Sequence, residues 1–126
     1  MKKEALAELL SKELIIGHVY GYNGEQQCFY FENSSSNIAN FLMFHHENAS
    51  EIVLTDMLDR MVLNTFGEFI NCCPDQNLLQ EILKDLIPMQ MGEKEPVSIS
   101  FATDKEAQAF WDEEEKNVME AEFRIL

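Results

Sequence analysis

Cationic residues are scarce in this sequence of 126 residues, which has 9 Lys and Arg against 23 Asp and Glu and a formal net charge of −14. Proteins that bind nucleic acids through phosphates need clustered cations, and Lys2–Lys3 is the only adjacent pair. The same charge opposes binding to anionic membrane surfaces. Direct nucleic-acid binding and membrane binding are therefore disfavoured, whereas a cationic partner, or solubility alone, would explain the negative charge.

Long apolar runs are lacking as well. No window approaches the roughly 18 apolar residues of a membrane span, and Glu4 and Glu8 interrupt the stretch that a signal peptide would need. The three cysteines, Cys28, Cys72 and Cys73, form no even framework for disulfide pairing. We therefore expect a reduced protein located in the cytoplasm.

Motifs for phosphate binding and nucleophilic catalysis are also absent. The five glycines are scattered, and neither a GxGxxG loop, nor a P-loop, nor a GxSxG elbow occurs. Acidic residues are so abundant that any pair could be proposed as general acid and base, so their number carries little weight. The sequence predicts no cofactor and favours a non-enzymatic protein.

Two segments rich in β-forming residues flank Asn23–Gly24 and predict a β-hairpin over 14–32. Asn-Gly adopts the positive φ angles of the turn that best matches the twist of paired strands. Alternating apolar and polar residues predict a further strand near 97–101. Segment 37–47 fits either a helix or a third strand, since its continuous apolar run does not separate the two.

A four-residue repeat of apolar pairs runs from Val53–Leu54 to Phe69–Ile70 and predicts one long helix over 51–72. The inward side of this helix would be used to hold the fold together. The preference for a non-catalytic role depends on that interpretation: an extended stretch, or an apolar side lining an open cavity, would remove it.

Two more helices are predicted after it. Asp75 is a typical N-cap for a helix over 76–87, which Pro88 is expected to end. Asp104 is expected to begin a helix over 104–120. The predicted architecture is a single α+β domain over 1–126, with a small antiparallel sheet covered by these helices.

A run of His45, His46 and Glu47 offers ligand types suited to zinc or non-haem iron. Adjacent side chains on a helix point about 100° apart, so one ion would not readily take both histidines. The favoured interpretation is a set of polar residues at the end of a helix. A small metalloprotein or hydrolase using these three residues is kept as an alternative.

The only tryptophan adjoins an acidic run, and together they form a candidate partner-binding segment: Phe110, Trp111, Asp112, Glu113, Glu114 and Glu115. An exposed Trp111 would anchor a partner inside an acidic rim. A buried Trp111 would belong to the core, and the helical stripe that it shares with Ala107 and Val118 favours burial.

The favoured function is a non-enzymatic module that binds another protein or forms a homodimer. Nine phenylalanines without any catalytic signature motivate this hypothesis. An alternative is an acidic mimic of DNA that inhibits a DNA-binding enzyme, as phage and mobile-element proteins can. That mimicry requires carboxylates aligned at phosphate-like spacing, which a total charge does not provide.

Overall fold

The computed structural model describes residues 2–125, with side chains described as far as Val118. Its elements follow the order α1 (Lys3–Leu10), β1 (Leu14–Gly21), β2 (Gln26–Glu32), α2 (Ser35–His45), the 3-10 turn η1 (His46–Asn48), β3 (Ala49–Asp56), β4 (Met61–Phe66), β5 (Phe69–Cys72), α3 (Gln76–Gln90), β6 (Phe101–Thr103) and α4 (Asp104–Ile125). The α+β class predicted from the sequence is confirmed. None of the described helices combines the length and apolar composition that crossing a bilayer requires.

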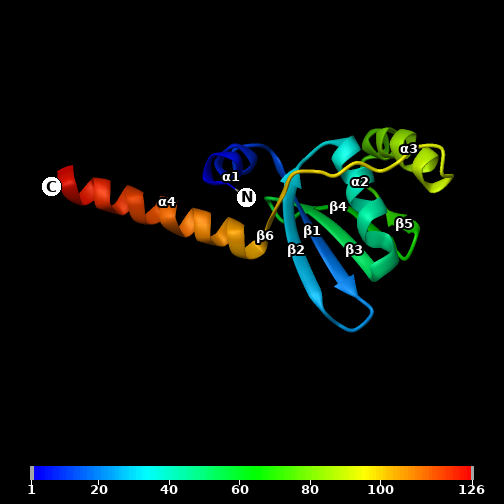
Figure 1. Ribbon diagram of the computed structural model, residues 1–126, viewed down its shortest axis with the longest axis horizontal. Coiled ribbons are helices and arrows are strands. Elements are labelled where there is room, and N and C mark those ends of the chain that lie inside the picture. Colours follow the sequence, from blue (N-terminus) through cyan, green and yellow to red (C-terminus); the bar gives the residue numbers. More distant parts are fainter. Residues whose placement is uncertain (1, 126) are drawn as a thin grey trace.

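The strands form one antiparallel sheet in the order β5-β4-β3-β1-β2-β6 (Figure 1). The predicted hairpin over 14–32 is confirmed, because β1 and β2 pair from Leu14↔Glu32 to Tyr20↔Gln26. Gly24 in its turn has a φ of 85°, a backbone conformation that glycine adopts without steric cost. The hairpin lies at the centre of the sheet, where β1 also pairs with β3.

The predicted long helix over 51–72 is wrong, because this stretch forms the three strands β3, β4 and β5. Neighbouring residues on a strand point to opposite faces, so Leu54 and Leu63 are buried while Val53 and Val62 are only half-buried. The apolar pairs recur every four residues because turns separate short strands. Because this stretch is extended, the helical lid on which the preference for a non-catalytic role depended does not exist.

The turn between β3 and β4 is held by one carboxylate. Asp56 accepts hydrogen bonds from the backbone N–H groups of Leu58 and Arg60, each at 2.9 Å, and from Arg60 Nε at 2.7 Å. Asp59 has a positive φ of 64° in this turn, and Gly67 has a positive φ of 59° in the turn between β4 and β5. These turns separate the strands in a stretch whose spacing of apolar residues matches a continuous helix.

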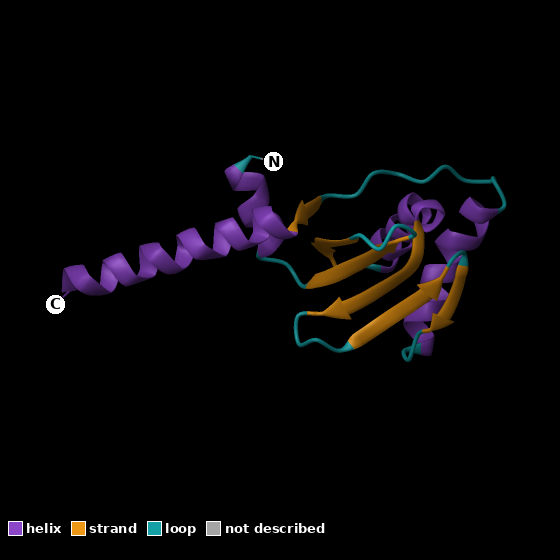
Figure 2. Cartoon of the chain, turned by 90° about the horizontal axis from the view of Figure 1, so that it is seen from below, coloured by secondary structure: helices purple, strands orange, loops and turns teal. Residues whose placement is uncertain are grey.

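Helices α2 and α3 pack together over one face of the sheet (Figure 2). Segment 37–47, for which helix and strand were both open, is helical up to His45, and Ser34 Oγ caps α2 by accepting from Asn37 N at 3.1 Å. The main core lies between these helices and the sheet and includes Ile15, Phe31, Ile38, Phe41, Ile52, Leu54, Leu63, Ile82 and Leu86.

Helix α3 begins as predicted and ends later than predicted. Asp75 Oδ1 accepts from the N–H groups of Asn77 and Leu78 at 3.0 and 3.1 Å, which confirms its role as N-cap. The expected end at 87 is wrong, because α3 continues to Gln90 with Pro88 inside its last turn. A proline there removes a single helical hydrogen bond, which the turn tolerates.

The strand expected near 97–101 is displaced toward the C-terminus, since β6 comprises Phe101–Thr103 and residues 97–100 belong to no strand. Asn40 explains part of this difference, because its Oδ1 accepts from Val97 N at 2.8 Å and holds the segment beside α2. β6 pairs with β2 at the edge of the sheet, from Phe29↔Thr103 to Phe31↔Phe101.

Helix α4 starts at its predicted position and continues past the predicted end to Ile125, but only its first turns pack against the sheet, so the expectation that the whole helix covers the sheet is wrong. Its first turns contact α1, β2 and β6, with Ala107 buried and Trp111 half-buried. Beyond them the helix extends away from the rest of the molecule (Figures 1 and 2). We call residues 112–125 the arm; Val118, expected to face inward, is 57% exposed there.

Candidate functional site

The structure places His45 and His46 in different surroundings. The half-buried His45 ring packs at centroid distances of 4.5 Å from Phe41 and 5.1 Å from Phe29, and burial lowers the pKa of His45. A neutral imidazole therefore joins an aromatic cluster. This contact favours a packing role for His45.

His46 instead faces the backbone of α2. Its Nδ1 lies 3.0 Å from the carbonyl oxygen of Met43, so Nδ1 carries a proton and donates this hydrogen bond. Glu47 is exposed. Among the described residues, no group of three or more His, Cys, Asp or Glu side chains is arranged to hold a metal ion.

Trp111 fixes the base of α4 to the sheet. Its ring meets Tyr30 edge to face with the centroids 5.3 Å apart, and Phe110 beside it is also half-buried. The Tyr30 hydroxyl donates to Asp104 Oδ1 at 3.3 Å, which secures the start of the same helix. The aromatic part of the predicted partner-binding segment therefore anchors the arm.

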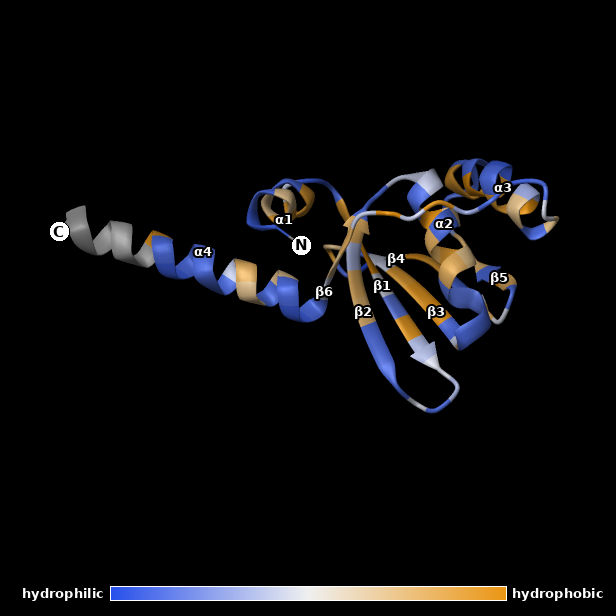
Figure 3. Cartoon of the chain, viewed as in Figure 1, coloured by the Kyte–Doolittle hydropathy of each residue, from blue (hydrophilic) through white to orange (hydrophobic). Residues whose placement is uncertain are grey.

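The acidic part of that segment lies on the arm. Asp112, Glu113, Glu114 and Glu115 are all exposed, and Glu113 pairs with Lys3 at 3.1 Å. In Figure 3 the residues along this part of α4 are coloured as hydrophilic, with one apolar position before the grey end of the helix. The sequence thus joins two regions with separate roles, an apolar base and a solvated acidic stretch.

A cleft of about 480 Å³ opens at the other end of the molecule, and we call it the α2–α3 cleft. Its walls come from the end of α2 and η1, from the β4–β5 turn and from α3. The lining residues are Met43, His46, Glu47, Glu68, Phe69, Ile70, Leu83, Leu86 and Gln90. Most of these side chains are apolar, Glu47 and Glu68 carry carboxylates, and His46 and Gln90 carry hydrogen-bond donors.

A small chamber of about 10 Å³ adjoins this cleft and shares Met43, His46, Glu68, Ile70, Leu86 and Gln90 with it. Thr65 also lines the chamber. This side chain is only 4% exposed, and its Oγ1 is buried without a hydrogen-bond partner among the described residues. Buried hydroxyls without a partner are rare in folded proteins, so the Thr65 hydroxyl is expected to destabilise the fold where it lies.

Replacing Thr65 by Val is expected to raise the free energy of unfolding by about 1 kcal/mol, because the isosteric change removes an unpaired buried hydroxyl. Urea denaturation followed by circular dichroism measures the difference. Thr65→Ser, which keeps the hydroxyl and loses a methyl group, is the matched control and is expected to be destabilised. A Val variant less stable than the natural protein would show that the hydroxyl is satisfied in solution and would contradict this prediction.

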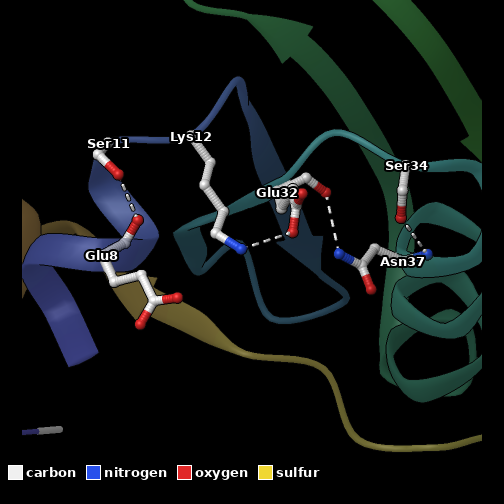
Figure 4. Close-up of polar contacts among 6 residues, drawn as sticks. All are labelled: Glu8, Ser11, Lys12, Glu32, Ser34 and Asn37. Atoms are coloured by element: carbon white, nitrogen blue, oxygen red, sulfur yellow. Dashed lines mark hydrogen bonds and ion pairs between the residues drawn. The ribbon is translucent and has the colours of Figure 1, made fainter.

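A second cleft, between α1, β2 and residues 98–100, has polar groups that pair with one another (Figure 4). Lys12 Nζ lies 3.4 Å from Glu32 Oε2, and Asn37 Nδ2 donates to the Glu32 carbonyl oxygen at 3.1 Å. Ser11 Oγ donates to the Glu8 carbonyl oxygen at 2.7 Å. These contacts tie α1 and the start of α2 to β2, which indicates a structural role.

Cys28 and His18 approach each other on the sheet face opposite α2 and α3. His18 Nδ1 lies 3.5 Å from Cys28 Sγ, and His18 Nε2 lies 3.1 Å from Thr55 Oγ1. Burial raises the pKa of Cys28, and the negative charge of Asp104 raises it further. The thiol is therefore held in its protonated form, which disfavours a role as nucleophile.

Sequence reasoning singled out His45, His46 and Glu47 as candidate metal ligands and missed the cleft that His46 and Glu47 line. Thr65 and Glu68 carried no signal, because the pattern assigned both to the interior of a long helix. Comparison of the chain with protein-family models, with curated proteins and with solved structures finds no match.

Proposed function

We propose that this protein is a non-enzymatic interaction module of the cytoplasm whose arm recruits a basic protein partner. The observation that carries the proposal is the extension of α4 away from the body of the molecule, with an acidic stretch exposed along it. The arm comprises the last 14 residues of this helix, 112–125, and is about 21 Å long at about 1.5 Å per residue, which gives a partner an extended surface.

Packing supports this interpretation. The helix is secured at its base by Ala107 and Trp111, whereas Val118 is exposed on the arm. Short helical segments without tertiary contacts are marginally stable in water, so contact with a partner would stabilise the arm. An exposed apolar residue near carboxylates suits a surface that combines apolar and cationic groups.

The negative charge of the arm favours a different protein as the partner over a second copy of this chain. Asp112, Glu113, Glu114 and Glu115 follow one another, so their carboxylates surround the helix instead of lying along one side. Two such helices side by side would bring like charges together, which costs free energy. A partner that presents Lys and Arg pairs with these groups, and it is also drawn to a chain with a net charge of −14.

Neutralising the four carboxylates of the arm is expected to weaken binding of a basic partner about tenfold, at a few tenths of a kcal/mol for each exposed pair. The variant is Asp112→Asn, Glu113→Gln, Glu114→Gln and Glu115→Gln in the full chain. The probe is a synthetic amphipathic helical peptide of leucine and lysine. Isothermal titration calorimetry measures its affinity.

The matched control changes the net charge by the same amount at four exposed positions in turns and loops: Glu25→Gln, Asp59→Asn, Glu93→Gln and Glu95→Gln. This variant is expected to keep most of the affinity. Equal losses in both variants would attribute binding to net charge and contradict a role for the arm. A stable dimer in analytical ultracentrifugation that dissociates on Val118→Asp would replace the basic partner by a second copy.

A further inference from the structure

The outer edge of β5 is open to pairing with a further strand. β5 is the last strand on its side of the sheet, and no described strand pairs with its free edge (Figure 1). Its four residues include neither a charged residue nor a proline, which commonly protect exposed edges from unwanted pairing. Phe69, Asn71 and Cys72 are exposed, so the described part of the chain leaves most of this strand uncovered.

The hairpin between β4 and β5 determines which backbone groups of this edge are free. A two-residue turn joins the strands and is flanked by the pair Phe66↔Phe69. The pair that closes such a turn is hydrogen-bonded, and the next pair, Thr65↔Ile70, is not, because the two kinds of pair alternate along antiparallel strands. The N–H and C=O groups of Ile70 therefore point away from β4, toward the place of an added strand.

The α2–α3 cleft lies on the helix-covered side of this edge, and its interior is apolar. Ile70 packs against the main core on that side and lines the cleft together with Leu83 and Leu86 of α3. The adjoining chamber has an almost entirely apolar surface, so a water molecule would find few hydrogen-bond partners there. An aliphatic side chain would instead gain free energy by burying its methyl groups against these walls.

Negative charge surrounds this apolar interior. Glu47 and Glu68 are exposed at the cleft, and no Lys or Arg is among the described residues that line it. A second copy of this chain, paired through its own β5, would bring a further Glu68 and another net charge of −14 to the same edge. The charge at the cleft therefore favours a partner that presents Lys or Arg.

We propose that the edge of β5 binds an extended segment of a basic partner protein, which adds a strand to the sheet and places an aliphatic side chain in the α2–α3 cleft. Backbone hydrogen bonds to Ile70 hold the segment, and every second side chain of a strand points to the same face. Basic residues two positions from the aliphatic one therefore share its face and pair with Glu47 and Glu68. This site lies apart from the arm, so it holds or fails independently of the function proposed above.

Short blocked peptides test the choice of occupant. The reference peptide has the order lysine, threonine, leucine, threonine, lysine, and fluorescence anisotropy of a labelled copy measures its affinity for the full chain. Replacing leucine by asparagine, which has a similar shape, is expected to weaken binding about tenfold, because the amide gains nothing from apolar walls. Replacing both lysines by glutamates is expected to abolish measurable binding.

N-methylated peptides distinguish strand addition from insertion of a side chain alone. In a strand bound at an edge, the N–H groups of alternate residues donate to the neighbouring strand, and the others point away from it. Methylation of the leucine nitrogen and methylation of the following threonine nitrogen are therefore expected to give unequal losses. One of them is expected to weaken binding at least about tenfold and the other only slightly.

Variants of the protein place the binding at this edge. Glu68→Gln is expected to weaken binding of the reference peptide several-fold, whereas Glu95→Gln removes the same charge outside the cleft and is expected to have no effect. The fourfold variant of the arm described above is expected to bind the peptide as the natural protein does. Amide shifts in nuclear magnetic resonance spectra are expected at Phe69, Ile70 and Leu83.

Four results would overturn the proposal. They are the absence of binding of the reference peptide at millimolar concentration, equal affinity of the leucine and asparagine peptides, and equal losses from the two N-methylations. The fourth is a dimer in analytical ultracentrifugation that dissociates when the reference peptide is added, because the natural occupant of the edge would then be a second copy of this chain.

Discussion

Replacement of Phe31 by Ala is expected to lower the free energy of unfolding by about 3–5 kcal/mol, the largest effect of any substitution considered for this protein. Phe31 lies in the central hairpin with 0% of its surface exposed, and its ring stacks on Phe41 at a centroid distance of 4.7 Å. The change removes buried apolar surface and leaves a cavity between the sheet and α2. Because small domains are stable by only about 5–15 kcal/mol, the variant would lie near the limit of folding.

Urea denaturation monitored by far-ultraviolet circular dichroism measures this loss. Tyr22→Ala is the matched control, since it also truncates an aromatic side chain but at a position that is 72% exposed. Its effect is expected to stay within about 0.5 kcal/mol. If Phe31→Ala and Tyr22→Ala gave similar small losses, the core would not lie between the sheet and helices α2 and α3.

Replacement of Gly17 by Val is expected to cost about 2–3 kcal/mol through overpacking of the same region. A Cβ atom built on Gly17 would lie 2.5 Å from Phe41 Cζ and 2.8 Å from Phe41 Cε1. Neither distance is compatible with carbon atoms at van der Waals contact. The Phe41 ring is held between Phe31 and His45, so it has little room to move away.

A double-mutant cycle separates this clash from the intrinsic effect of losing a glycine. Phe41→Leu alone is expected to destabilise the protein, yet in its presence Gly17→Val is expected to cost much less, because the smaller side chain gives space to the new methyl groups. Thermal unfolding by calorimetry provides the four measurements. Additive losses in the double variant would contradict a direct contact between the two positions.

Local signals with a clear stereochemical cause were predictable from the sequence. Asn23–Gly24 specifies its turn because few other dipeptides adopt the required backbone angles, and the hairpin on either side followed from it. Asp75 predicted the start of α3 because its carboxylate satisfies two N–H groups that the first helical turn leaves free. Both features are decided by a few neighbouring residues.

The region 51–72 shows where such reasoning fails. Apolar pairs at a spacing of four residues match a helix, but they also arise when short strands alternate with tight turns. The turn at Asp56 forms through hydrogen bonds to its own carboxylate, and Asp59 adopts a positive φ without being glycine, so neither residue gave a strong signal of a turn. The strand pairing with β1, which overrides the helical period, depends on contacts distant in the sequence.

The α2–α3 cleft was beyond prediction for a related reason. Its residues come from three segments, and Thr65 is notable only because folding buries its hydroxyl without a partner among the described residues. His46 was noticed for its chemistry, but the hydrogen bond that orients it runs to a backbone carbonyl, which no side-chain pattern reveals. Trp111 was also undecided, because the stripe that buries it at the base of α4 ends where the arm begins.

Strand β6 is held in the sheet by few residue pairs, so it is expected to unfold locally before the central strands do. Its register joins residues as far apart as Phe29 and Thr103 through three residue pairs, whereas the central hairpin pairs over its whole length. Partial unfolding proceeds in cooperative units, and those with few contacts open at the lowest free energy. Release of β6 together with the start of α4 would free the C-terminal helix while the core between α2, α3 and the remaining strands stays closed, so amide hydrogens of Phe101–Thr103 would exchange before those of β1.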